Sequence, residues 1–482
     1  MLSPTPTVNT SPNSGDISLS STKERSGGVT LALLFLVLLT PINLDVAGLA
    51  LSPYKIFLLI MFWPWAARLI SGYAGPVTWT GWLLLAFVVW TIVTLVYNNG
   101  IQRFPYASMV AAELFGGYMA GRILVRNISD YRRFIRYYLI ALLFILPFAA
   151  YELFYSRMLV NDFLGSIFSV TRKNYEFRYG LSRVQFGFPH SILFGLFCSL
   201  ALASTYYLYV HSFFKMLPRM ALVIGTTLMS LSSGPMLSLV LQTVMIVWDI
   251  LTRGSWKIFC GLTVFAYFFL ETFSNRGAVV FLVETMTLNP MSGWWRIHIW
   301  RHGSLSVLNN PIWGIGLNDW VRPKFLSGSV DNFWLLMAMR HGFPGISLLL
   351  LALALHIFAI IRIKNLPDEA KNIRKAYMIT LAGLLFTLTT VHIWGAVTVM
   401  VMFYIGAGSF LYANPMGVQD DDARKSDELS ESSSRQPEPQ SSDNIHQGRY
   451  SRFANKPRRF NRDHADGSQS RTISPKRKTH TR

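Results

Sequence analysis

The run FWLLMAMRHGFPGISLLLLALALHIFAII, residues 333–361, decides the class of fold. It is long enough to cross a bilayer as a helix, because about 20 apolar residues span the hydrocarbon core. Its polar interruption, RHGFPG at residues 340–345, comes about two turns into the run. Gly and Pro break a membrane helix only where neighbours or water satisfy the freed backbone groups. An Arg at that depth, here Arg340, is expected to face a polar cavity.

Similar apolar runs recur along the chain and predict an all-α polytopic membrane protein. They cover residues 29–44, 54–70, 79–97, 106–124, 134–154, 192–210, 220–251, 258–273, 376–393 and 396–411. The run 220–251 is too long for one ordinary span. We expect it to divide at SSGP, residues 232–235, because Gly-Pro is a turn signal. The prediction is therefore about twelve transmembrane helices.

Composition supports a membrane protein and argues against a nucleic-acid-binding one. Apolar residues make up 51% of the 482 residues and charged residues only 14%, whereas soluble domains carry about a quarter charged residues. The net charge of +19 comes mainly from loops that flank apolar runs, which is the pattern of the positive-inside rule. The two cysteines, both within apolar runs, provide no disulfide or metal-binding framework.

Basic side chains in alternate loops predict the orientation. They are Arg122, Arg126, Arg132, Arg133 and Arg136, then His211, Lys215 and Arg219, then Arg253 and Lys257, then Arg362, Lys364, Lys371, Arg374 and Lys375. With twelve spans all four groups fall on one side, which the positive-inside rule makes the cytoplasm. Both termini of this multi-pass protein are then cytoplasmic. The first run is expected to be an uncleaved span rather than a signal peptide, because another apolar run follows at once.

Composition predicts that the two ends of the chain are disordered. Residues 29–413 are then the membrane domain. Residues 1–28 are rich in Ser, Thr, Pro and Asn, and residues 414–482 are polar throughout. The tail is acidic first and basic towards its end. Its basic part suits contact with anionic lipid or a cytoplasmic partner, and a simple solubilising tail is the alternative.

Two long loops on the opposite side are unexpectedly basic. The loop 155–189 and the loop 274–330 contain Arg157, Arg172, Lys173, Arg178, Arg183, Arg276, Arg296, Arg301, Arg322 and Lys324. An anionic ligand would explain them, because Arg offers paired donors to phosphate. The alternative is that such long loops are translocated regardless of charge.

The segment MSGWWRIHIWRHG, residues 291–303, predicts a short amphipathic helix along the membrane face. Its Trp residues suit the headgroup region. At helical spacing Trp294, His298 and Arg301 share one face, and Arg296 and Trp300 share another. The helix could be an interfacial anchor with snorkelling arginines. It could also direct Arg296 into a cavity next to rings that stack on sugars.

Asp331 and His190 are the candidates for proton transfer. Asp331 precedes Asn332 and the run 333–361, so it is either a helix N-cap or a general base. His190 leads into the run 192–210 and either binds substrate or serves a structural role at the helix start. The sequence contains no HExxH, no Cys/His cluster and no P-loop. A site without metal or cofactor, working through Arg and one base, remains.

Four stretches resemble the O-antigen ligase and polysaccharide polymerase family of bacterial inner-membrane proteins. They are RVQFGFPHSILFG (183–195), GWWRIHIW (293–300), NPIWGIG (310–316) and DNFWLLMAMRHGFPG (331–345). The resemblance implies an inverting, metal-independent glycan transfer on the periplasmic face, in exopolysaccharide or lipopolysaccharide O-antigen biosynthesis. The donor would be a polyprenyl-diphosphate-linked glycan, and the acceptor a lipid A core or another lipid-linked saccharide.

The resemblance also implies roles for residues. Arg296 and Arg183 would hold the diphosphate, and Asp331 stands where the ligases have a catalytic His before Asn. A carboxylate there can still deprotonate a sugar hydroxyl. Further candidate substrate contacts are His190, Arg276, His298, Arg301, Asn332 and Arg340. A flippase for lipid-linked oligosaccharide, or a noncatalytic partner of a synthesis complex, is the alternative.

Overall fold

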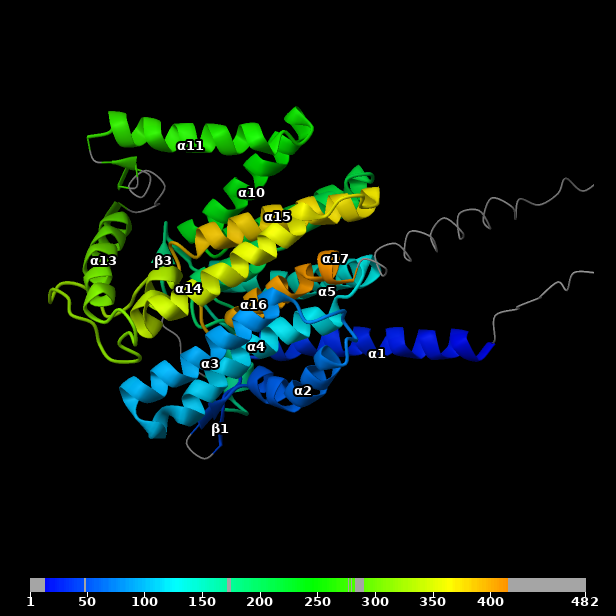
Figure 1. Ribbon diagram of the computed structural model, residues 1–482, viewed down its shortest axis with the longest axis horizontal. Helices are drawn as coiled ribbons and strands as arrows, with labels where there is room; N and C mark the ends of the chain where they lie inside the picture. The colour runs from blue at the N-terminus through cyan, green and yellow to red at the C-terminus, as the bar shows by residue number, and fades with distance from the viewer. Residues whose placement is uncertain are drawn as a thin grey trace, which may run out of the picture. The chain divides into compact units, whose positions relative to one another are not determined.

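The computed structural model describes residues 14–46, 49–170, 175–275, 277–278, 280–281 and 290–414 (Figure 1). This part of the chain is mostly helical, as the apolar runs predicted. Two small antiparallel hairpins are present in it, β1 (Leu44–Val46) with β2 (Leu49–Leu51) and β3 (Phe177–Arg178) with β4 (Leu181–Ser182).

The helices follow the predicted apolar runs closely. In the first half they are α1 (Ser14–Leu39), α2 (Pro53–Ile70), α3 (Trp79–Asn99), the short η1 (Ile101–Arg103), α4 (Phe104–Leu124), α5 (Ile128–Tyr155) and α6 (Leu159–Gly165). In the second half they are α7 (Ser191–Ser199), α8 (Leu202–Tyr209), α9 (Phe213–Leu228), α10 (Ser233–Thr252), α11 (Trp256–Phe273), α13 (Pro290–Asn309), α14 (Phe333–Arg362), α15 (Asp368–Thr387), α16 (Ala396–Gly408) and α17 (Phe410–Ala413).

Seven helical segments within the described residues are long and apolar enough to cross a membrane. They are Trp79–Asn99, Ile128–Tyr155, Ser191–Tyr209, Ser233–Thr252, Trp256–Phe273, Phe333–Arg362 and Ala396–Ala413. The chain is therefore a membrane-embedded protein of the all-α class. The predicted division of the run 220–251 is confirmed, because α9 ends at Leu228 and α10 begins at Ser233.

The centre of the fold is the contact between α4 and α16, which lie side by side in Figure 1. Both helices are almost wholly buried there. A side chain on Gly121 would collide with the Phe403 carbonyl, and one on Gly406 would collide with the Tyr118 carbonyl. Small residues at a helix crossing let the two backbones approach closely, which is how membrane helices gain packing contacts.

Several boundaries differ from the sequence-based expectations. Helix α15 spans Asp368–Thr387, where the apolar run covered residues 376–393, and α5 begins at Ile128 rather than at residue 134. Helix α1 begins at Ser14, inside the segment 1–28 that was predicted to be disordered. Helix α13 spans Pro290–Asn309 and is therefore longer than the short helix predicted for residues 291–303. The polar tail from residue 415 onwards lies outside the described residues, and so does Arg276.

Helix α14 is broken where the RHGFPG interruption predicted a break. Gly342 has a φ of 66°, and Pro344 follows it. The carbonyl of Met339 accepts a hydrogen bond from the amide of Ile315 at 2.8 Å, and the carbonyl of Arg340 accepts one from Gly316 at 3.1 Å. The loop containing NPIWGIG thus satisfies backbone groups that the break leaves free.

The same loop is fastened to the end of α3. The Asn98 side chain donates to the Trp313 carbonyl at 3.0 Å, and the Asn99 side chain accepts from the Leu317 amide at 2.9 Å. The Trp313 ring stacks on Tyr97 with 4.3 Å between centroids. The loop 310–332 is therefore a fixed wall rather than a free connection.

Candidate functional site

Two cavities meet at Asp331. The first has a volume of about 600 Å³ and is lined by Trp320, Arg340, His392 and Trp394 among others, and we call it the aromatic compartment. The second, of about 570 Å³, we call the basic compartment, and its cationic lining residues are Arg178, Arg183, Arg296 and Lys324. Asp331, His190, Ile192 and Ser329 line both cavities. The two compartments are therefore neighbours with a shared wall.

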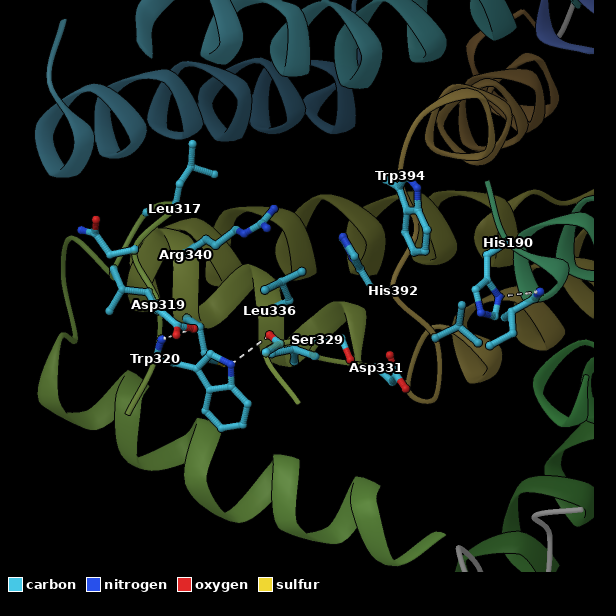
Figure 2. A pocket seen from close by; sticks show the side chains of 18 residues that line it. His190, Leu317, Asp319, Trp320, Ser329, Asp331, Leu336, Arg340, His392 and Trp394 are labelled. Carbon is cyan, nitrogen blue, oxygen red and sulfur yellow. Dashed lines mark hydrogen bonds between the residues drawn. The ribbon is translucent and has the colours of Figure 1, made fainter. Parts of the chain in front are cut away.

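Asp331 does not cap helix α14, although the sequence allowed that role. The N-cap is Asn332, whose side chain accepts a hydrogen bond from the Leu335 amide at 3.0 Å. The Asp331 carboxylate is exposed and makes no hydrogen bond or ion pair with the described residues. It lies beside the aromatic compartment in Figure 2. Asn332 is thus a structural residue rather than a lining residue of either cavity, and Asp331 is free to act on a ligand.

We expect Asn332→Ala to lower the stability of the protein by about 1 kcal/mol, because the first turn of α14 loses its side-chain cap. Asn332→Ser and Asn332→Asp should retain nearly full stability, because both residue types cap well. Thermal unfolding of the purified protein in one detergent measures the differences. Equal stability of the Ala and Ser variants would contradict the assignment of the cap.

Arg296 lies on α13 and lines the basic compartment. Its Nε atom is buried without a hydrogen-bond partner among the described residues. Burial lowers the pKa of its guanidinium from the ordinary value, Arg178 adds to that effect, and the charge of Asp331 opposes it. A buried cation without a fixed partner is costly. An anion bound in the compartment would supply the missing hydrogen bonds.

Arg183 is more firmly held than Arg296. It forms an ion pair with Glu176, and its Nη2 donates to the Ser232 hydroxyl at 2.8 Å. Arg178 in turn donates to the Leu231 carbonyl at 2.7 Å. Four cationic side chains therefore line one compartment, where Asp331 is the carboxylate among the lining residues. Such a concentration of positive charge favours a polyanionic ligand.

Glu152 of α5 holds the backbone of the segment that carries Arg183. Its carboxylate accepts hydrogen bonds from the Gln185 amide at 2.8 Å and from the Phe186 amide at 3.0 Å. The carboxylate is buried, and Phe186 has a φ of 51°. This positioning role was not predicted, because it joins an apolar span to a loop more than 30 residues away.

His190 has a structural role as well as a place in both cavity walls. Its Nδ1 accepts a hydrogen bond from the Ile192 amide at 3.1 Å, which caps α7. Its Nε2 lies 3.3 Å from Glu176 Oε1. The hydrogen bond from His190 holds the pKa of the Glu176 carboxyl below its ordinary value. Both ring nitrogens are therefore occupied, and His190 is a poor candidate for the base.

The aromatic compartment is bounded by polar and ring-bearing residues from distant parts of the chain. Figure 2 shows Asp319 and Trp320 at one end and His190 at the other, with Arg340, His392 and Trp394 along one side. The His392 ring stacks on Trp394 with 5.4 Å between centroids. Burial, together with the charge of Arg340, lowers the pKa of His392 to about 3. Its imidazole is therefore neutral at physiological pH.

The predicted site residues divide into two groups. Asp331, Arg296, Arg183, His190 and Arg340 line the two compartments. His298 instead packs against Trp294, with 4.0 Å between ring centroids, and Arg301 is exposed; both lie away from the cavity walls. Lining residues that the sequence did not single out as a site include Arg178, Ser329, Trp320, Lys324, His392 and Trp394. Of these, Arg178 and Lys324 belong to the unexpectedly basic loops.

Comparisons with protein-family models and with curated protein sequences give no match for this chain. Within the described part of the chain, no group of three or more His, Cys, Asp or Glu side chains could hold a metal ion. The chemistry of the site therefore depends on its own side chains. These are guanidinium groups in one compartment, Trp and His rings in the other, and an unpaired carboxylate between them.

Proposed function

We propose that this protein is a metal-independent, inverting glycosyl transferase of the O-antigen ligase or polysaccharide polymerase type. It would act in exopolysaccharide or lipopolysaccharide assembly. The observation that carries the proposal is the position of Asp331, an unpaired carboxylate between the basic and aromatic compartments. The basic compartment would bind the diphosphate of a polyprenyl-linked donor. The aromatic compartment would bind the acceptor glycan, because Trp rings present apolar faces of the kind that stack on sugars.

In this mechanism Asp331 takes the proton from the acceptor hydroxyl as general base. The hydroxyl oxygen forms a bond to the anomeric carbon of the donor on the face opposite the diphosphate, so the configuration inverts. The bond between that carbon and the diphosphate oxygen breaks, and the diphosphate keeps the electron pair. Arg296 and Arg183 stabilise the charge that grows on the leaving group. The proton then passes from Asp331 to water, and polyprenyl diphosphate leaves.

The site would face the periplasm in a chain with twelve spans. The crossings would be α1, α2, α3, α4, α5, α7 with α8, α9, α10, α11, α14, α15, and α16 with α17. The end of α5 and the starts of α7, α10, α14 and α16 then fall on one side. These ends adjoin Glu152, His190, Ser233, Asp331 and Trp394, which line or support the compartments. The positive-inside rule puts that side opposite the basic loops.

Reporter fusions test this topology. A reporter active only in the periplasm should be silent when fused after Leu411, because the tail is expected in the cytoplasm. The same reporter inserted near Ser306 of α13 should be active. A cytoplasm-specific reporter at the same two sites is the control and should give the opposite pattern. Activity of the periplasmic reporter after Leu411, or its silence near Ser306, would place the proposed site on the cytoplasmic face and contradict the topology.

Proteoliposomes separate the proposed transfer from its two alternatives. The purified protein is reconstituted with a polyprenyl-diphosphate-linked oligosaccharide in both leaflets and an acceptor glycan outside. A transferase forms a longer glycan and releases polyprenyl diphosphate. A flippase moves donor between leaflets without making a bond, and a noncatalytic partner does neither. Absence of a new glycan alongside normal donor translocation would favour the flippase.

A further inference from the structure

We infer that the aromatic compartment binds a glycan that carries a carboxylate, and that Arg340 is the residue that recognises this charge. The inference rests on the proposed function, because it takes this compartment to be the acceptor side. It goes further by giving the acceptor a chemical class, an acidic glycan. The basic compartment would then bind the donor diphosphate, and the aromatic compartment would bind the carboxylate of the acceptor.

Arg340 lines the aromatic compartment and is mostly buried, yet its guanidinium makes no hydrogen bond or ion pair with the described residues. The two carboxylates of this compartment, Asp319 and Asp331, form no ion pair with Arg340. Asp319 forms an ion pair with Arg322, and the charge of Asp331 acts on Arg296. A mostly buried guanidinium without an anionic partner is costly, and a bound anion removes that cost.

Hydrogen bonds hold the backbone around Arg340 in place, so the start of its side chain has a fixed position. Its carbonyl accepts the hydrogen bond from Gly316 at 3.1 Å. The Nδ1 atom of the next residue, His341, forms a hydrogen bond with the Thr94 hydroxyl at 2.7 Å. The His341 carbonyl accepts a hydrogen bond from the Trp90 indole at 2.8 Å. Preorganisation of this kind reduces the entropy that a ligand must overcome on binding.

The remaining lining suits a sugar rather than a free anion. His392 carries a buried Nδ1 without a hydrogen-bond partner among the described residues, so it can bond to a hydroxyl. Trp394, whose side chain is exposed, contributes ring surface. The cavity volume of about 600 Å³ exceeds what a single carboxylate needs. An oxyanion on a lipid headgroup has the same charge chemistry, and the experiment below includes it as a separate arm.

The test measures binding of an acidic oligosaccharide and of its neutral counterpart. The full chain is placed in nanodiscs of uncharged lipid, and the probes are a tetrasaccharide of alternating glucose and glucuronate and the same tetrasaccharide with its carboxyls reduced. Wild type should bind the acidic probe about tenfold or more tightly than the neutral one, because an Arg–carboxylate pair is a charge-assisted hydrogen bond. Arg340→Gln should remove the preference, and Arg340→Lys should keep part of it. Arg301→Gln, which alters an exposed Arg on α13, should keep all of it.

Two outcomes would overturn the inference: equal affinity of wild type for both probes, or a preference that survives in Arg340→Gln. Competition by phosphatidylglycerol nanodiscs that depends on Arg340 would also overturn it, because a lipid headgroup would then be the ligand. Farnesyl diphosphate binding in the same samples should depend on Arg296 and not on Arg340. That arm verifies that Arg340→Gln is folded. If the wild type did not bind farnesyl diphosphate, the proposed function would be contradicted, whatever the result with the acidic tetrasaccharide.

Discussion

Asp331→Asn is expected to reduce glycan transfer by about two to four orders of magnitude, the usual contribution of a general base. Asn has nearly the same shape as Asp but lacks the carboxylate that would accept the proton. Because Asn332 and not Asp331 caps α14, the substitution should leave folding and membrane insertion unchanged. Initial rates of transfer from a polyprenyl-diphosphate-linked donor, at matched concentrations of folded protein, measure the effect.

Asp162→Asn is the matched control for this experiment. Asp162 is an exposed carboxylate on the short helix α6, away from both compartments, and its loss should not change the rate. Asp331→His is expected to restore part of the activity, because imidazole can serve as a general base and the resembling ligases have His at this place. Near-normal turnover by Asp331→Asn would exclude a protein base here and leave the arginines as the catalytic groups.

Arg296→Lys is expected to lower the transfer rate nearly as much as Arg296→Ala, by about 100-fold or more. Removing one preorganised donor to a developing oxyanion typically costs this much. Lys keeps the charge but cannot reproduce the planar pair of donors that matches a diphosphate. The Nε of Arg296 is buried without a hydrogen-bond partner among the described residues, and a ligand with directional acceptors would satisfy it. Initial rates at saturating acceptor, over a range of donor concentrations, show whether binding or turnover is affected.

Arg301→Lys is the control for Arg296→Lys, because Arg301 is an exposed residue of the same helix. It should retain normal rates. If Arg296→Lys also kept most of the activity, Arg296 would be an interfacial anchor whose charge alone matters. The basic compartment would then depend on Arg183 and Arg178.

The membrane helices could be predicted because apolar length alone determines them. The run 54–70 became α2 (Pro53–Ile70), and the run 106–124 became α4 (Phe104–Leu124). The break in α14 could be predicted because Gly342 and Pro344 lie two residues apart in one short polar stretch, and both residue types are unfavourable in a helix interior. Its hydrogen-bonding partners, the amides of residues 315 and 316, could not, because they come from a separate loop.

The site was predictable in its residue types and not in its arrangement. Asp331 and Asn332 are equally good caps by type, so the sequence could not decide which of them is free. His190 and Glu152 owe their roles to contacts with segments that a linear reading does not bring together. His298 does not line either compartment, and its ring packs against Trp294 and Phe325.

The most direct test of the account is a product analysis with purified wild-type protein, a lipid-linked donor of known anomeric configuration and an acceptor glycan, in the presence of EDTA. Nuclear magnetic resonance identifies the new glycosidic linkage, and ³¹P spectra identify the released lipid. The proposed mechanism predicts a linkage of inverted configuration and polyprenyl diphosphate with both phosphates intact, formed at the same rate with and without the chelator. A retained configuration, release of polyprenyl monophosphate, or no new linkage would contradict it.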